Sequence, residues 1–165
     1  MSSIGNVQYC RGDILNVSKG IILHGCNSLG LMGKGLAKQV KHKYPQVFQD
    51  YSKYCYSARC HPDCLNYSDP GGLILGKIIT TPINSRLIVI SGITQLTIGN
   101  DPNVKYANLN AIQQVFRQVN EIAVNLGLEV HMPKIGCGLG GLDWIQVSGL
   151  LTMFSSEVKI NIWEL

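Results

Sequence analysis

Two glycine-rich segments contain the residue types best suited to binding phosphate groups. The first runs from His24 to Ala37 and the second from Met132 to Trp144, and each follows an apolar run and precedes a helical pattern. Glycine at such a junction lets backbone N–H groups approach an anion, and the N-terminus of the following helix adds a favourable dipole. One loop of this kind holds one phosphate. Two loops in one fold therefore predict a site that grips a diphosphate from both sides.

Two common phosphate motifs fit these segments poorly. Residues 33–35 read Gly-Lys-Gly and resemble the end of a P-loop, but Gly35 stands where a Ser or Thr must ligate Mg²⁺, and Ser28 stands where the first glycine belongs. Residues 136–141 satisfy the G-x-G-x-x-G pattern, yet only one predicted strand follows them. The dinucleotide-binding fold places this pattern in its first βα turn, with more strands following. We therefore exclude a P-loop and a dinucleotide-binding fold.

Cysteine and charge patterns leave two alternatives open. Three of the six cysteines lie near one histidine in the group Cys55, Cys60, His61 and Cys64. This group could bind zinc, but it lacks a paired Cys-x-x-Cys knuckle, so free thiols and no metal are expected. The net charge is +4, and four lysines fall in one stretch beside His42: Lys34, Lys38, Lys41 and Lys43. They form either a solvated helix face or a basic wall that attracts phosphate or nucleic acid.

The length and hydropathy pattern predict one domain over residues 1–165 with an α/β fold, because apolar runs alternate with helical patterns. No apolar run approaches the roughly 18 residues of a membrane span, and the first six residues do not resemble a signal peptide. We therefore expect a soluble, cytoplasmic protein without a membrane partner. The predicted strands are Val7–Arg11, Ile21–His24, Leu73–Thr80, Leu87–Ser91, Glu129–Met132 and Val158–Trp163.

The clearest helix is predicted from about Tyr106 to Leu126, where apolar residues recur at three- and four-residue steps. Gly127 then caps its C-terminus. Further helices are expected after Gly35, after Pro45 and after Asp143. Asp143 can cap the last helix, with Gln146 completing a capping box. The stretch from Arg59 to Gly72 is predicted to be the longest loop.

Three motifs together resemble the macrodomain family. They occur in the family's order and spacing across nearly the whole chain: Gly12-Asp13-Ile14, then His24-Gly25-Cys26-Asn27 with Gly33-Lys34-Gly35, then the run from Ile135 to Trp144. The most similar types are phage-type members, the fungal ADP-ribose 1''-phosphate phosphatases and the terminal ADP-ribose glycohydrolase branch. The resemblance implies a three-layer α/β/α macrodomain with a central mixed sheet, which binds ADP-ribose or a derivative and needs no cofactor.

The resemblance also implies binding roles for individual residues. Asp13, beside Ile14, would accept the adenine amino group, and Asn27 would contact the distal ribose. Both could instead simply form turns. Ser91 and Thr94 would close the far side of the site. The diphosphate would lie against Gly33, Lys34, Gly35, Gly136, Cys137, Gly138, Leu139, Gly140 and Gly141.

Catalytic roles are less completely defined. Family members that form a covalent sugar adduct use a lysine where Gln95 stands here, and their acidic partner is replaced by Gly140, so that chemistry is not expected. Hydrolases with three consecutive glycines are a poor match too, because Lys34 interrupts the run. The phosphatase branch fits best: His24 would relay a proton to the leaving sugar oxygen, with Asn27 beside it.

Structural roles remain as alternatives at three positions. His24 could be a structural histidine at a strand end, Asp143 a helix cap and Cys137 a small filler residue.

Three functions follow from the sequence. The first is an ADP-ribose 1''-phosphate phosphatase. The second is another hydrolase, which acts on ADP-ribosylated protein or nucleic acid or on O-acetyl-ADP-ribose. The third is a non-catalytic ADP-ribose reader, with nucleic acid along the Lys34 to Lys43 face as an additional partner.

Overall fold

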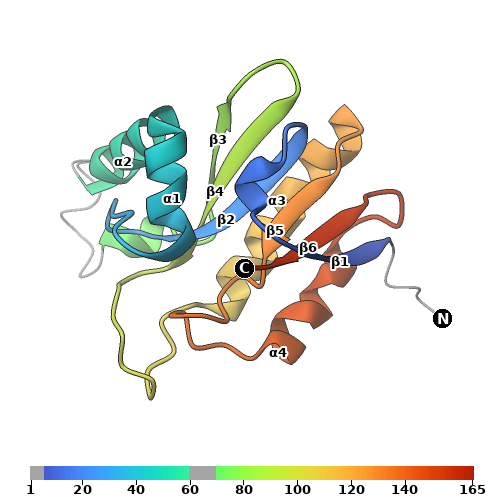
Figure 1. Cartoon of the computed structure of the whole chain (residues 1–165). Coiled ribbons are helices and arrows are strands. Elements are labelled where there is room, and N and C mark those ends of the chain that lie inside the picture. The colour runs from blue at the N-terminus through green and yellow to red at the C-terminus, as the bar shows by residue number, and fades with distance from the viewer. Residues whose placement is uncertain (1–5, 60–69) are drawn as a thin grey trace.

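The computed structural model describes residues 6–59 and 70–165, and these residues form a mixed β-sheet flanked by helices (Figure 1). The strands lie in the order β1-β6-β5-β2-β4-β3. All neighbouring pairs are parallel except β3 with β4, which is antiparallel. The strands are β1 (Val7–Arg11), β2 (Gly20–Asn27), β3 (Ile78–Pro82), β4 (Leu87–Gln95), β5 (Val130–Pro133) and β6 (Ile160–Glu164).

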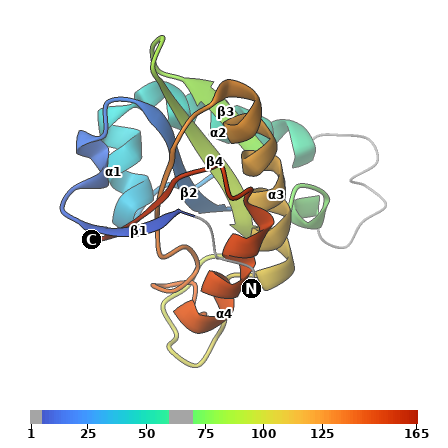
Figure 2. The ribbon, with the colours of Figure 1, turned by 90° about the vertical axis from the view of Figure 1, so that its right-hand side faces the viewer.

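Helices cover both faces of this sheet, as Figures 1 and 2 show. Helices α1 (Gly35–Lys43) and α2 (Pro45–Arg59) cover one face, and α3 (Leu109–Leu126) and α4 (Trp144–Gly149) cover the other. Short 3₁₀ helices follow β1, precede β3 and follow α4: η1 (Ile14–Asn16), η3 (Pro70–Leu73) and η4 (Leu150–Met153). The predicted three-layer α/β/α architecture is therefore confirmed.

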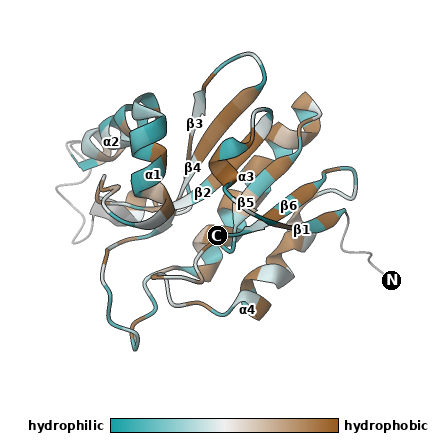
Figure 3. Ribbon diagram, viewed as in Figure 1, coloured by the Kyte–Doolittle hydropathy of each residue, from teal (hydrophilic) through white to brown (hydrophobic). Residues whose placement is uncertain are grey.

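The central strand β2 explains why both faces need helices. Ile21 and Leu23 pack into the core under α3, whereas Ile22 packs into a second core under α1 and α2. All three are fully buried. A parallel strand buried on both faces must be apolar almost throughout. The brown central strands and the largely teal outer surface of α1 in Figure 3 show the same division.

Helix α3 begins three residues later than its periodicity predicts. Asn108 caps it by accepting a hydrogen bond of 2.9 Å from the backbone N–H of Ala111, and the helix starts at Leu109 rather than Tyr106. Its predicted end is confirmed, because Gly127 adopts the left-handed conformation (φ 63°) and closes the last turn. The start of α4 is also confirmed, since the Asp143 side chain accepts from the N–H of Ile145.

The predicted strand Leu73–Thr80 is wrong in its first half. Residues 70–73 form a 3₁₀ helix, and the strand begins only at Ile78. Gly76 turns the chain with φ 85°, and a side chain there would collide with Gln114 of α3. The loop predicted from Arg59 to Gly72 falls largely on residues outside the described part, although its two ends are helical. No helix in the described ranges is both long and apolar enough to cross a membrane.

Candidate functional site

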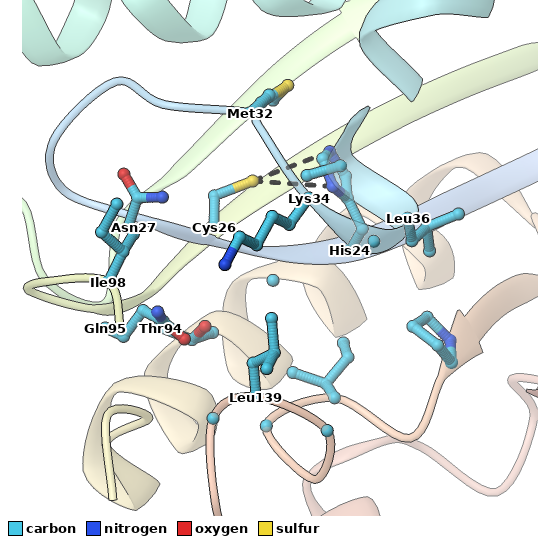
Figure 4. Close-up of a pocket in the computed structure, with 18 of the residues that line it drawn as sticks. His24, Cys26, Asn27, Met32, Lys34, Leu36, Thr94, Gln95, Ile98 and Leu139 are labelled. Carbon is cyan, nitrogen blue, oxygen red and sulfur yellow. Dashed lines mark hydrogen bonds between the residues drawn. The ribbon is translucent and has the colours of Figure 1, made fainter. Parts of the chain in front are cut away.

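A cleft of about 870 Å³ lies where the parallel strands end. The carboxyl ends of neighbouring parallel strands meet at one edge of a sheet, so the loops after β2, β4 and β5 converge there with the end of β6. Loop residues from both glycine segments line this cleft (Figure 4). The structure therefore brings the two predicted phosphate loops together.

Asn27 organises the first loop from within. Its Oδ1 accepts hydrogen bonds from the N–H groups of Leu29 (3.0 Å) and Leu31 (3.3 Å), and its Nδ2 donates to the carbonyl of Leu31 (2.8 Å). The hydroxyl of the buried Tyr51 also contacts it. The side chain thus has internal partners on both amide atoms. Asn27 lines the cleft, but its observed hydrogen bonds are those of a turn-forming residue.

The first loop ends by presenting the N-terminus of α1 to the cleft. Lys34 is the N-cap, and its side chain makes no capping hydrogen bond. The first N–H groups of an α-helix have no partner inside the helix, so they point out of its N-terminus. A Cβ added at Gly33 or Gly35 would meet nothing within 4 Å, which means that both glycines border open space. This end of the loop can accept an anion.

The second loop, residues 134–142, is held by its own backbone. The N–H groups of Cys137, Gly141 and Leu142 bond to carbonyls of the same loop. Within the described part of the chain, the N–H groups of Gly138, Leu139 and Gly140 donate to no backbone carbonyl. Three adjacent unpaired N–H groups on a turn beside a cleft form a typical anion-binding element.

Different structural constraints account for the individual glycines of this second loop. A side chain at Gly140 would lie 2.6 Å from a backbone oxygen and 2.8 Å from Ala107, so packing alone requires glycine there. Gly136 (φ 79°) and Gly141 (φ 80°) adopt conformations that favour glycine. Gly138 has neither constraint and faces open space. Neither packing nor backbone conformation requires glycine at this position.

A third side of the cleft comes from the end of β4. The β2–β4 register shifts so that Cys26 pairs with Ile93 and Asn27 with Gln95, which leaves Thr94 as an extra residue. Thr94 lines the cleft with Gln95 and Ile98. Ser91, predicted beside them, lies outside the lining and is fully buried in the sheet.

His24 occupies a position unlike that of a proton donor. It touches the cleft but is only 1% exposed, and its Nε2 lies 2.9 Å from the Ser91 hydroxyl. Burial lowers the pKa of His24 to about 4, so the ring is neutral at physiological pH. A neutral, internally bonded imidazole is poorly placed to deliver a proton to a sugar oxygen. The geometry favours the structural alternative for His24.

The environments of the cysteines also fit a structural role and not a catalytic one. Burial raises the pKa of the Cys26 thiol well above its ordinary value, and burial raises that of Cys137, which lies outside the cleft lining. Neither is an activated nucleophile. Of the alternative zinc group, Cys55 is buried beneath Gly30, while Cys60, His61 and Cys64 lie outside the described residues. The described residues contain no group of three or more metal-ligating side chains.

The two predicted adenine residues lie near one end of the cleft without lining it. The Asp13 carboxylate accepts from the N–H of Leu15 and caps η1, and Ile14 is fully buried. A Cβ on the adjacent Gly12 would lie 3.7 Å from the ring of Trp163, which does line the cleft. Asp13 thus follows a residue whose backbone lies beside the cleft wall.

The cleft contains several side chains that the motifs did not indicate. Leu36, Phe48 and Trp163 contribute apolar and aromatic side chains to its wall, and Ile98 and Asn100 also line it. A tryptophan at the carboxyl end of a predicted strand was the available signal for Trp163. For Phe48 no signal existed, because the helical pattern alone does not say which side faces the cleft.

Charge in the cleft is mainly positive. Lys34, Lys41 and Lys134 line it, and Glu164 is the one carboxylate side chain among the described lining residues. Glu164 lies 3.2 Å from the ammonium of Lys134, so its charge is already compensated. Figure 4 shows Lys34 extending across the cleft toward the side where Asn27 and Ile98 lie, with Leu139 rising from the opposite loop. This distribution suits an anionic ligand.

Comparison with known proteins identifies the class of the fold. Residues 23–151 match the family model described as Macro domain, and the chain belongs to this family. An ADP-ribose 1''-phosphate phosphatase of Saccharomyces cerevisiae is 25% identical over 189 residues, which cover 98% of this chain and 100% of that protein.

Two further likenesses involve larger proteins. The DNA ADP-ribosyl glycohydrolase of Mycobacterium tuberculosis is 30% identical over 142 residues, covering 86% of this chain but only 36% of that relative. Among solved structures, Thermosipho africanus DarTG in complex with ADP-ribose superposes with a TM-score of 0.72 at 22% identity. This match covers 96% of the chain and 41% of that structure, and at this identity it indicates a shared fold alone.

Proposed function

We propose that this macrodomain binds ADP-ribose in the cleft and hydrolyses ADP-ribose 1''-phosphate to ADP-ribose and inorganic phosphate. The observation that carries the binding proposal is the pair of loops with unpaired N–H groups, one at the N-terminus of α1 and one at 138–140. Both border the same cleft, and Gly33, Gly35 and Gly138 leave room for a ligand between them. A diphosphate satisfies both sets of donors at once.

The two ends of the cleft differ in chemistry, and this difference orients the ligand. Trp163, at the end of β6 and away from β4, offers aromatic surface on one side, which suits the flat, apolar face of a purine. Thr94, Gln95 and Asn100 offer hydroxyl and amide groups at the other end, which suit a sugar. The adenine therefore lies toward Trp163 and the distal ribose toward Thr94.

The reaction proposal rests on the full-length likeness to the yeast phosphatase and on which catalytic groups the cleft offers. In the hydrolysis, a water oxygen attacks phosphorus, the bond from phosphorus to the sugar oxygen breaks, and that oxygen takes the proton that the attacking water gives up. The loops hold the diphosphate and fix the terminal phosphate by positioning. Lys34, whose ammonium extends toward the distal end, stabilises negative charge on the transferred phosphate. Gln95 cannot form the covalent adduct of an amine, which argues against a lysine-type glycohydrolase.

Calorimetry with ADP-ribose, AMP and NAD tests the binding. We expect ADP-ribose to bind most tightly, and Asp13→Ala to weaken ADP-ribose and AMP alike. Asp13→Asn is the matched control, because an amide oxygen can still accept from Leu15 and keep η1 capped. A protein with no affinity for ADP-ribose would disprove the binding proposal. Phosphate release from ADP-ribose 1''-phosphate tests the reaction, and binding without release would leave a reader module instead.

The lysines of α1 favour one further partner. Lys34, Lys38 and Lys41 are exposed, and no ion pair involves them within the described ranges. Lys34 and Lys41 also line the cleft, so the basic stripe continues the ligand site. This pattern fits a nucleic acid that carries the ADP-ribose group, the substrate class named for the mycobacterial relative.

A salt titration tests this second candidate. Binding of a fluorescent single-stranded oligonucleotide should weaken steeply as salt rises, because lysines that neutralise phosphates release counterions. The double variant Lys38→Ala, Lys41→Ala should reduce that slope. Affinity independent of salt would rule the nucleic acid partner out.

A further inference from the structure

A chain of polar contacts lies directly behind the aromatic wall of the cleft. The indole Nε1–H of Trp163 donates a hydrogen bond of 3.1 Å to Nδ1 of His131 on the neighbouring strand β5. The other ring nitrogen, Nε2, lies 3.9 Å from Oε2 of Glu129, and Oε1 of Glu129 lies 3.7 Å from the ammonium of Lys159. The parallel pairing of β5 with β6 brings these residues together.

The indole fixes the tautomer of His131. An indole nitrogen can only donate, so Nδ1 of His131 must carry no proton, and the hydrogen of the neutral ring sits on Nε2, facing Glu129. Burial lowers the pKa of His131, Glu129 opposes that effect, and Lys159 adds to it. From β2, the residue packed against the ring is Gly20, which has no side chain, and from β6 Asn161 donates to Glu129. Glu129 and Lys159 are therefore the charged groups that face His131.

We propose that His131 is a positioning residue that holds Trp163 as the wall for the adenine base. The inference rests on the proposed ADP-ribose function, and it adds a residue outside the cleft to that site. Stacking depends on the direction in which the indole face points, and the hydrogen bond to His131 sets that direction. Without an acceptor, the half-buried indole N–H loses its partner and the ring turns toward water.

Two substitutions separate this role from simple packing. His131→Leu removes the acceptor, whereas His131→Asn places an amide oxygen close to the Nδ1 position. We expect His131→Leu to weaken ADP-ribose binding about 3- to 10-fold, the range that one hydrogen bond supplies, and His131→Asn to restore most of it. Ribose 5-phosphate, which has no base, should bind all three proteins equally. Unchanged ADP-ribose affinity in His131→Leu would overturn the proposal, and so would an equal loss for ribose 5-phosphate.

Tryptophan fluorescence tests the same contact without a ligand. The chain has two tryptophans, so in a Trp144→Phe background the emission reports Trp163 alone. That emission should change as His131 gains a proton at acid pH, and adding His131→Leu should abolish the change. A pH-independent emission in the parent would overturn the His131–Trp163 coupling. If the emission changes with pH but the wild-type protein does not bind ADP-ribose, the contact between His131 and Trp163 is supported. The proposed function and the role of Trp163 in binding adenine would then both be disproved.

Discussion

The hydroxyl of Tyr51 in α2 lies 2.6 Å from the backbone oxygen of Asn27 and 2.9 Å from its Oδ1. Tyr51 is fully buried, and one turn later Cys55 packs under Gly30. A further turn along, Arg59 donates to the carbonyl of Ser28 (3.1 Å). One face of a single helix thus supports the first phosphate loop from behind. The conformation of this loop therefore depends on its contacts with α2 as well as on its own glycines.

Tyr51→Phe should therefore weaken ADP-ribose binding without changing any residue that lines the cleft. The variant keeps the ring in the core but removes the hydroxyl that fixes Asn27, so the loop loses preorganisation. We expect a loss of about 3- to 10-fold in affinity, which corresponds to one hydrogen bond. Calorimetry measures it. Val119→Ala, in the core under α3, is the stability control and should bind normally. Equal affinities for Tyr51→Phe and wild type would show that the loop holds its shape alone.

Gly138→Glu should strongly weaken diphosphate binding. The position has open space and no positive φ, so the substitution leaves the fold intact while placing a carboxylate between the unpaired N–H groups. Repulsion and steric blocking together should cost at least tenfold in affinity, or about 1.4 kcal/mol. Gly149→Glu is the matched control, because Gly149 is equally open but lies at the end of α4, outside the cleft. Similar affinities for the two variants would contradict the diphosphate cradle.

The architecture could be predicted from the sequence because local patterns determine it. The alternation of apolar runs with helical patterns predicts the α/β class, the resemblance to macrodomains implies the three layers, and the paired glycine loops predict where the cleft lies. The start of α3 could not be predicted, because the Asn108 cap competes with a helical pattern that extends to Tyr106. The strand expected from Leu73 failed because Gly76 packs against Gln114, a contact between distant segments.

The site was less predictable than the fold for the same reason. Both glycine loops lie in the cleft, as their strand–loop–helix pattern predicts, but the state of a side chain depends on its neighbours in space. The side chains of Ser91 and His24 form a hydrogen bond with each other inside the sheet, and no sequence pattern indicates that pairing. Trp163 reaches the cleft only because β6 ends beside β5.

Lys34→Ala should affect the phosphorylated substrate more than ADP-ribose. The ammonium has no acidic partner in the described ranges and extends toward the distal end of the cleft. A hydrogen bond to a charged group contributes about 1.5–3 kcal/mol, so kcat/KM for ADP-ribose 1''-phosphate should fall about 10-fold or more. Steady-state phosphate release measures this effect. Lys38→Ala, in the first turn of α1 but outside the cleft lining, should leave kcat/KM unchanged. Equal effects of the two variants would indicate only a general electrostatic attraction.

Acid should destabilise the protein through His24. Burial holds its pKa at about 4, below the ordinary value of 6.5, so the unfolded chain binds a proton between these values and the native state does not. The stability that neutral His24 contributes is complete above pH 6.5 and is lost as pH falls toward 4, a change on the order of 3 kcal/mol. Urea unfolding at pH 7, 6, 5 and 4.5 measures the slope, and His24→Gln should flatten it because glutamine does not titrate. If wild type and His24→Gln lost stability in parallel, His24 would have to be solvated in the native state. The same result would revive the catalytic role predicted from the sequence, since an exposed imidazole with an ordinary pKa could again exchange protons with the substrate.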